Sequence, residues 1–124
     1  MHLINLIGWS GSGKGYLAEK IIETFGADRV DTIPMDMYYY PHEQFPENLH
    51  VEFEWNKFKN FDTPEALETE HLIKHIEQLR NGQEIQIPEY DFGSNPTGKA
   101  QRKPGKIVKP KDFIILDGLF WLCN

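Results

Sequence analysis

The 124-residue sequence has one cysteine, no long apolar run and no excess of positive charge. A single cysteine, Cys123, excludes an internal disulfide and a zinc site built from cysteines, and beside apolar Leu122 it is expected to be an ordinary core thiol. No stretch approaches the roughly 20 apolar residues of a membrane span, and the first residues do not form a signal peptide. The net charge of −6 argues against a duplex nucleic-acid binder. We therefore expect a cytoplasmic protein that binds neither nucleic acid nor membrane.

The rest of the composition, 40% apolar and 26% charged residues, is that of an ordinary globular domain. At this length the chain is expected to form one domain, residues 1–124. Apolar runs predict strands, and apolar residues repeated on one helical face predict helices. The predicted strands cover residues 2–7, 30–35, 85–88 and 113–116, and the predicted helices cover residues 14–25 and 64–80. This order of strands and helices indicates an α/β fold.

Both predicted helices have boundary signals in the sequence. Gly26 is placed to end the first helix, and Pro64 is placed at the first position of the second, after Asp62 or Thr63 as N-cap. The residues expected on the buried faces are Leu17, Ala18, Ile21, Ile22 and Phe25 in the first helix and Leu67, Ile73, Ile76 and Leu79 in the second.

Two segments outside the predicted helices have weaker patterns. The apolar residues of segment 43–60 show no clear helical or strand periodicity, so this segment is expected to be a surface loop with one short helical turn. Residues 105–108 are expected to pair back on residues 85–87 as a β-hairpin. The sequence contains no internal repeat and no low-complexity tract.

A glycine-rich stretch, GWSGSGKG, covers residues 8–15 between the first predicted strand and helix. It follows the phosphate-binding template of Gly, four residues, Gly, Lys and then Ser or Thr. Glycines let the backbone approach an anion, the helix N-terminus adds a positive dipole end, and Lys14 adds a mobile charge for the outer phosphates. A flexible turn with a solvated Lys14 is the alternative, which the flanking strand and helix disfavour. The residues expected to bind the nucleotide are Gly8, Ser10, Gly11, Ser12, Gly13, Lys14, Gly15 and Tyr16.

Gly15 departs from the template, because it stands where a Ser or Thr hydroxyl would bind Mg²⁺. Water can fill that coordination position, since Mg²⁺ commonly keeps several waters. The loop therefore predicts nucleotide phosphate binding and leaves metal binding by residue 15 open.

Three carboxylates and two histidines are further candidates for chemistry. Asp117 follows the strand at 113–116, as the Mg²⁺-binding acid of a Walker B motif does, although many strands end in an Asp-Gly turn. Asp36 precedes three consecutive tyrosines, residues 38–40, at a strand end, where a base would orient the nucleophile; a turn acid or helix cap is an equal alternative. Asp62 is more simply a helix N-cap. His71 and His75 have no third ligand and are expected to be surface residues.

Together these motifs resemble the uridine kinase (uridine–cytidine kinase) family of P-loop kinases. The match runs in family order through the loop at 8–15, PMDMYY at 34–39, NFDTPEA at 60–66, IPEYDF at 87–92 and IILDG at 114–118. The resemblance implies a P-loop NTPase fold, a three-layer α/β architecture with a parallel sheet, and a small β-hairpin for the nucleoside. It also implies in-line transfer of the γ-phosphoryl group of ATP, with Mg²⁺, to uridine or cytidine.

The resemblance also implies a role for each matching residue. Asp36 matches the acid that orients or deprotonates the nucleoside 5′-hydroxyl, Lys14 matches the catalytic lysine of the loop, and Asp117 matches the metal-binding acid. The residues that match the nucleoside site are Asp36, Tyr39, Phe61, Asp62, Tyr90 and Phe92, with Asp62 on the ribose hydroxyls and Tyr90 and Phe92 on the base.

The chain also departs from the family pattern. Asn95 stands where a histidine usually reads the pyrimidine, and Thr97 stands where a basic residue is common. Family members continue past the position of Asn124 with further strands and an arginine-bearing lid, so slow or absent turnover is expected of this chain. The alternatives are an inactive ATP-binding protein and a related P-loop kinase of another small metabolite. The expected partner is a small-molecule nucleoside, and the pattern leaves a homo-oligomer open.

Overall fold

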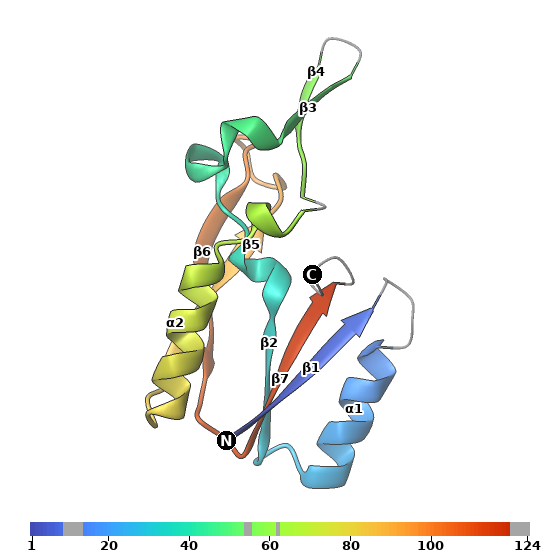
Figure 1. Ribbon diagram of the computed structural model, residues 1–124, viewed down its shortest axis with the longest axis vertical. Helices are drawn as coiled ribbons and strands as arrows, with labels where there is room; N and C mark the ends of the chain where they lie inside the picture. Colours follow the sequence, from blue (N-terminus) through green and yellow to red (C-terminus); the bar gives the residue numbers. More distant parts are fainter. Residues whose placement is uncertain (9–13, 54–55, 62, 120–124) are drawn as a thin grey trace.

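The computed structural model describes residues 1–8, 14–53, 56–61 and 63–119 (Figure 1). Its centre is a parallel sheet of β1 (His2–Gly8), β7 (Phe113–Leu119) and β2 (Val30–Pro34), with β7 in the middle. His2 and Val30 both pair with Phe113, so the three strands start level and end at the same edge. The predicted α/β class with a parallel sheet is confirmed.

Helix α1 (Lys14–Phe25) covers one face of this sheet, with the bounds that the sequence predicts. Its Ala18, Ile21 and Ile22 pack against a buried cluster of Leu6, Val30 and Ile115. The prediction of a buried Leu17 was wrong, because that side chain lies beside the narrow contact stripe and is half exposed. The helix ends where predicted, since Gly26 has a φ of 95° and its N–H donates to the carbonyl of Ile22.

The opposite face is covered by helix α2 (Thr69–Arg80) together with a β-hairpin. Leu72 and Leu79 of α2 are buried and Ile76 is partly buried, whereas Ile73, predicted to be buried, is half exposed. The predicted helix start was also wrong. Residues Pro64–Ala66 form a separate 3₁₀ turn, η4, and α2 begins five residues later than predicted.

The hairpin consists of β5 (Ile85–Asp91) and β6 (Gln101–Val108). Ile85 pairs with Val108, as predicted, and the pairing continues well past the predicted residues to Asp91 and Gln101. The register shifts between Gln86 and Pro88, where Pro88 faces Pro104 and neither residue has an N–H to donate. Gly105 is required beside this shift, because a Cβ there would lie 2.7 Å from the Ile87 carbonyl oxygen.

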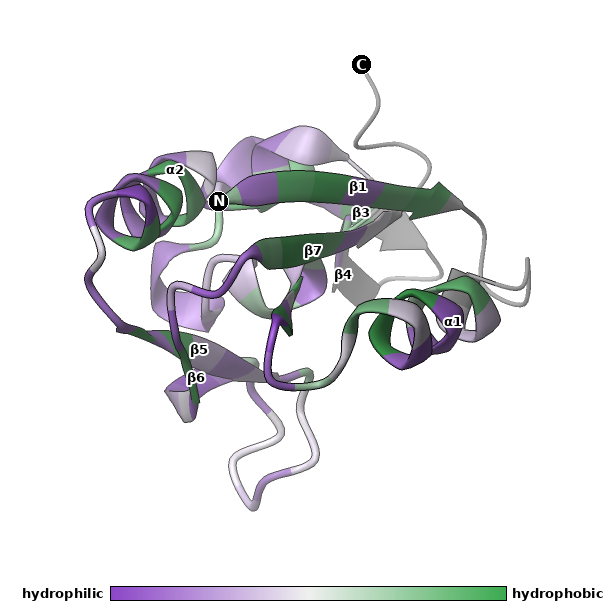
Figure 2. Ribbon diagram, turned by 90° about the horizontal axis from the view of Figure 1, so that it is seen from below, coloured by the Kyte–Doolittle hydropathy of each residue, from purple (hydrophilic) through white to green (hydrophobic). Residues whose placement is uncertain are grey.

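Alternating residues of β7 connect the two faces. Ile114 and Leu116 belong to the core beneath α2 and the hairpin, whereas Ile115 belongs to the core beneath α1. Figure 2 shows the apolar strands β1 and β7 between α1 on one side and α2 with β5 and β6 on the other. The implied three-layer architecture is therefore confirmed for the described part of the chain.

Residues 42–59 contain more regular structure than the sequence predicts. Two 3₁₀ turns, η2 (His42–Gln44) and η3 (Glu47–Leu49), precede an antiparallel hairpin of β3 (His50–Phe53) and β4 (Asn56–Lys59). This hairpin extends away from the sheet at one end of the molecule (Figure 1). In the described residues no helix is long and apolar enough to cross a membrane.

Candidate functional site

The carboxyl ends of the three parallel strands bring the predicted chemical groups to one edge of the sheet (Figure 1). Asp117 lies inside β7 and not after it as predicted, and it pairs with Leu6 of β1 on one side and Pro34 of β2 on the other. Asp36 follows β2 by two residues, and the glycine-rich loop follows β1. Parallel strands bind ligands at this edge in open α/β sheets.

The structure describes the two ends of the glycine-rich loop, Gly8 and residues 14–15. Gly8 ends β1, and Lys14 begins α1. Gly15 lies in the first helical turn with open space around it, since an added Cβ would meet nothing within 4 Å. Tyr16 is largely exposed, and its ring lies beside the Lys20 ammonium. The predictions for Ser10, Gly11, Ser12, Gly13 and the Lys14 side chain lie outside the described residues, as do those for Asp62 and Cys123.

Asp36 belongs to η1 (Met35–Tyr38), a 3₁₀ turn that directly follows β2. The alternative of a helix cap does not hold for this turn, because Pro34 occupies its N-cap. The backbone after Asp36 is fixed by the neighbouring segment 66–68: the Glu68 N–H donates to the Tyr38 carbonyl at 2.8 Å, and the Tyr40 N–H donates to the Ala66 carbonyl at 3.0 Å. The half-buried Asp36 carboxyl is thus held on a constrained turn at the sheet edge.

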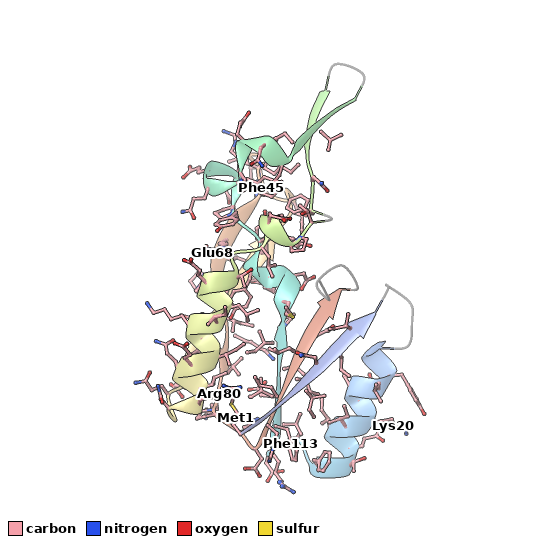
Figure 3. The ribbon with its side chains drawn as sticks, viewed as in Figure 1. Met1, Lys20, Phe45, Glu68, Arg80 and Phe113 are labelled. Carbon is pink, nitrogen blue, oxygen red and sulfur yellow. The ribbon has the colours of Figure 1, made fainter. Side chains whose placement is uncertain are left out.

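Four aromatic rings predicted to form the nucleoside site do lie together, and we call them the aromatic cluster. Its members are Tyr39, which follows η1, Phe61, which follows β4, Tyr90 of β5, and Phe92, which follows β5. Their ring centroids lie between 4.6 Å (Tyr90–Phe92) and 6.0 Å (Phe61–Tyr90) apart, in edge-to-face arrangements. Such pairs stabilise one another beyond their buried area. Phe45, labelled in Figure 3, extends the cluster through its contact with Phe61.

The two tyrosine hydroxyls of the cluster donate to backbone carbonyls. Tyr39 donates to Phe61 at 2.9 Å, and Tyr90 donates to Tyr40 at 2.8 Å. Burial raises the pKa of Tyr90 to about 12, so its hydroxyl stays protonated at neutral pH. These bonds tie the three segments of the cluster together.

Arg102 of β6 is the main polar link between the hairpin and the segment that carries Asp36. Its Nε and Nη2 donate to the carbonyls of Tyr39 and Tyr38, both at 3.0 Å, and its Nη1 donates to the Glu68 carboxylate at 2.8 Å. Glu68 lies just before the first turn of α2 (Figure 3). The sequence alone assigns Arg102 no role, because no local pattern shows which backbone carbonyls a side chain will reach.

The turn between β5 and β6 is organised by Asp91 and Asn95. The Asp91 carboxylate accepts from the N–H groups of Gly93 and Ser94 at 2.9 and 2.7 Å and from Asn95 Nδ2 at 3.1 Å. These hydrogen bonds hold the pKa of Asp91 below its usual value, and the bond from the Gly93 N–H has the largest effect. Asn95, at the position where the family resemblance implies base reading, is used here to fold the turn.

His71 and His75 are not surface residues, contrary to the prediction. Both are partly buried against Tyr38, whose hydroxyl lies 2.7 Å from His75 Nδ1, and the two imidazole centroids are 4.4 Å apart. Burial lowers the pKa of His75 to about 4, with His71 adding to the effect. Neutral imidazoles beneath Tyr38 therefore support η1 from the side of α2.

Comparison with known proteins places these features in a family. The phosphoribulokinase/uridine kinase family model matches residues 3–124. The chain belongs to this family. A uridine kinase of Clostridium novyi (strain NT) is 36% identical over 120 residues, covering 97% of this chain and 53% of the relative. One of Brevibacillus brevis is 37% identical over 121 residues, covering 97% and 51%. The chain thus spans about half the length of these relatives.

A solved structure shows the same fold. The structure described as a possible uridine kinase from Bacillus stearothermophilus aligns with a TM-score of 0.62 at 21% identity. The alignment covers 96% of this chain and 61% of that one. At this level of identity the match supports the P-loop kinase fold of the phosphoribulokinase/uridine kinase family.

The side chains described at the sheet edge fit a Mg²⁺ ion that binds together with the phosphates of a nucleotide. Mg²⁺ in kinases is bound by one or two carboxylates together with phosphates and waters, and Asp117 supplies one half-buried carboxylate at the sheet edge. Among the described residues, no three His, Cys, Asp or Glu side chains are grouped to hold a metal by themselves. The open space at Gly15 leaves room for a water where other loops carry a hydroxyl.

Proposed function

We propose that this chain forms the ATP-binding and acceptor-binding part of a nucleoside kinase that phosphorylates uridine or cytidine to UMP or CMP. The observation that carries the proposal is the meeting of three parts at one sheet edge: the β1–loop–α1 unit, Asp36 after β2, and the aromatic cluster beside it. The names of the curated relatives support the same activity.

The reaction needs positioning more than covalent chemistry from the protein. The nucleoside 5′-oxygen forms a bond to the γ-phosphorus of ATP while the bond to the β,γ-bridging oxygen breaks, releasing ADP. Asp36 orients the hydroxyl and takes its proton. Lys14 neutralises charge on the outer phosphates. Bound Mg²⁺ would neutralise the β- and γ-phosphate oxygens, with Asp117 as its protein ligand.

Rings of the aromatic cluster place the acceptor relative to these groups. Tyr39 lies three residues after Asp36, and the hydrogen bonds of Arg102 fix the backbone between them against β6. A base held against the cluster would therefore lie at a fixed distance from the acid. Asp62, which directly follows Phe61 in the chain, is proposed to bind the ribose hydroxyls.

The substitution Asp36→Asn tests the assignment of the acid. We expect phosphoryl transfer, measured as coupled ADP release with uridine and cytidine, to be abolished, while ATP affinity measured by calorimetry stays nearly unchanged. Asp112→Asn is the matched control, since Asp112 is an exposed acid at the opposite edge of the same sheet, where it pairs with the exposed Arg29. If ATP affinity collapses in Asp36→Asn, the residue is a structural or metal-binding group and not the proposed base.

Gly15 favours a second candidate function, ATP binding without phosphoryl transfer. The residue has no hydroxyl for the metal. Under this candidate the chain binds Mg·ATP and releases no ADP when nucleoside is added. Turnover near the roughly 1–100 s⁻¹ that is usual for kinases would exclude it.

A further inference from the structure

Tyr38 is the buried anchor of the turn that carries Asp36. It is the last residue of η1, and its side chain is 0% exposed. Its carbonyl accepts from the Glu68 N–H at 2.8 Å and from Arg102 Nη2 at 3.0 Å. Asp36 lies two residues earlier on the same short turn. The place of the Asp36 carboxyl therefore depends on how Tyr38 is seated in the core.

The Tyr38 hydroxyl bonds to a polar group of α2, the helix that runs beside η1 (Figure 1). It lies 2.7 Å from His75 Nδ1, which is a hydrogen-bond distance. Burial raises the pKa of Tyr38 above its usual value, so the phenol keeps its proton. Burial also lowers the pKa of His75 to about 4, so the imidazole is neutral and has a lone pair on one ring nitrogen. A protonated phenol and a neutral imidazole can serve each other as donor and acceptor.

His71 offers a comparison on the same helix. Its ring packs edge-on against Tyr38 with the centroids 5.2 Å apart, close to the 5.6 Å of the His75 ring. Within residues 63–119 and the other described segments, its Nδ1 is buried without a hydrogen-bond partner. Both histidines thus contact the Tyr38 ring, whereas the hydroxyl bonds to His75.

Loss of the His75 acceptor would leave the Tyr38 hydroxyl unpaired in the core. A buried donor without a partner is unfavourable, because it has given up its hydrogen bonds to water. The ring belongs to the core beneath α2 and the hairpin, so it cannot turn to water by itself. The hydroxyl would regain a partner only through a shift of η1, which carries Asp36. A misplacement of about 1 Å can cost an enzyme about 100-fold in rate.

We propose that His75 is a positioning residue for phosphoryl transfer. Through its hydrogen bond with the Tyr38 hydroxyl it fixes η1, and with η1 it fixes the Asp36 carboxyl against the acceptor hydroxyl. The inference rests on the proposed function and extends the machinery from the sheet edge to helix α2.

The kinetic signature follows from what holds the neighbouring residue, Tyr39. Its hydroxyl donates to the Phe61 carbonyl at 2.9 Å, and its own carbonyl accepts from Arg102 Nε at 3.0 Å. Because these supports do not involve His75, loss of His75 should lower kcat more than it changes the KM for the nucleoside. The affinity for Mg·ATP should be kept, because the glycine-rich loop follows β1 and not β2.

The experiment measures ADP release with uridine and cytidine at saturating Mg·ATP, with the rate expressed per folded chain from circular dichroism. His75→Leu should lower kcat by about 10–100-fold. His75→Asn keeps an amide group near the place of Nδ1 and should restore most of the rate.

The double variant Tyr38→Phe/His75→Leu is the decisive one. It removes both partners, and replacing both by apolar groups of similar shape is nearly neutral. It should therefore be faster than His75→Leu alone, since no unpaired hydroxyl is left to displace η1. His71→Leu is the matched control, because it makes the same substitution one helical turn away and leaves the bond of the Tyr38 hydroxyl intact. Its kcat should stay nearly unchanged.

The outcomes distinguish this inference from the proposed function. A His75→Leu variant that keeps its kcat, or a double variant slower than His75→Leu, overturns the inference and leaves the proposed kinase function standing. A fall in ATP affinity parallel to the fall in kcat also overturns it, because general damage to the fold would then explain the loss. If the unmodified chain binds Mg·ATP and releases no ADP with either nucleoside, the proposed function itself fails, and the inference fails with it.

Discussion

Substitution of Arg102 by alanine should destabilise the chain far more than removal of an ordinary surface arginine. The variant removes two hydrogen bonds to the carbonyls of Tyr38 and Tyr39 and an ion pair with Glu68. The side chains of Arg102 and Glu68 are only 18% and 28% exposed, so water replaces the lost partners poorly. Leaving one partner of a fully buried pair alone costs about 3–5 kcal/mol. For this partly buried pair we expect a loss of about 2–4 kcal/mol.

The assay is urea unfolding followed by circular dichroism. With a slope of about 2 kcal/mol per molar urea, the middle of the usual range, the expected loss lowers the midpoint by about 1–2 M without changing the slope. Because the hairpin would also come loose from the segment that carries Asp36, nucleoside affinity should fall while ATP affinity is kept.

Arg29→Ala is the matched control for this prediction. Arg29 pairs with Asp112 at the same distance, 2.8 Å, but the two side chains are 50% and 62% exposed. Exposed pairs contribute about 0–1 kcal/mol, so the Arg29 variant should lose less than about 1 kcal/mol. Equal losses in the two variants would refute the reasoning, since burial is what distinguishes the pairs. A double-mutant cycle of Arg102 and Glu68 should in addition give a coupling energy above about 0.5 kcal/mol.

Three further predictions concern other parts of the fold. Gly15→Ser should tighten Mg·ATP binding in calorimetry, because a hydroxyl can enter the open space there; an unchanged affinity would mean that Asp117 and water suffice. Ile115→Ala, at a fully buried site, should cost about 2–5 kcal/mol in urea unfolding, whereas Ile73→Ala on the exposed side of α2 should change stability by less than about 0.5 kcal/mol. The lowered pKa of His75, about 4 in the folded chain, means that the unfolded chain binds the extra proton between pH 6.5 and 4, so stability should fall as the pH drops through that window. His75→Gln should flatten this dependence, and an unaltered pH profile would contradict the assignment.

Much of the fold follows from local sequence patterns. Strand β1 and helix α1 were predicted with nearly correct bounds, because a continuous apolar run and one apolar helical face are both encoded by neighbouring residues. The end of α1 at Gly26 has the same local origin, since the left-handed φ favours glycine. The grouping of Asp36, Tyr39, Phe61, Tyr90 and Phe92 as site residues came from the family resemblance, and the structure brings the four rings together.

Other features depend on contacts between distant segments. The start of α2 at Thr69 and not at Pro64 follows from the pairing of Tyr39 with Leu67, which the helix-start signals around Pro64 do not contain. Leu72 is buried and Ile73 is half exposed, whereas Ile76 and Leu79 face the core as predicted. A local start signal therefore gave the right element and the wrong first residue.

The order of β1, α1 and β2 along the chain and the bounds of α1 follow from the sequence, because they depend on residues close together. Tertiary structure alone decided what the polar side chains do. Arg102 reaches the carbonyls of residues 63 and 64 positions away in the chain, and His75 reaches Tyr38 across 37. Such partners are chosen by how layers pack and by which buried carbonyls need donors. A sequence pattern shows that a donor exists, and only the packed fold shows where it is used.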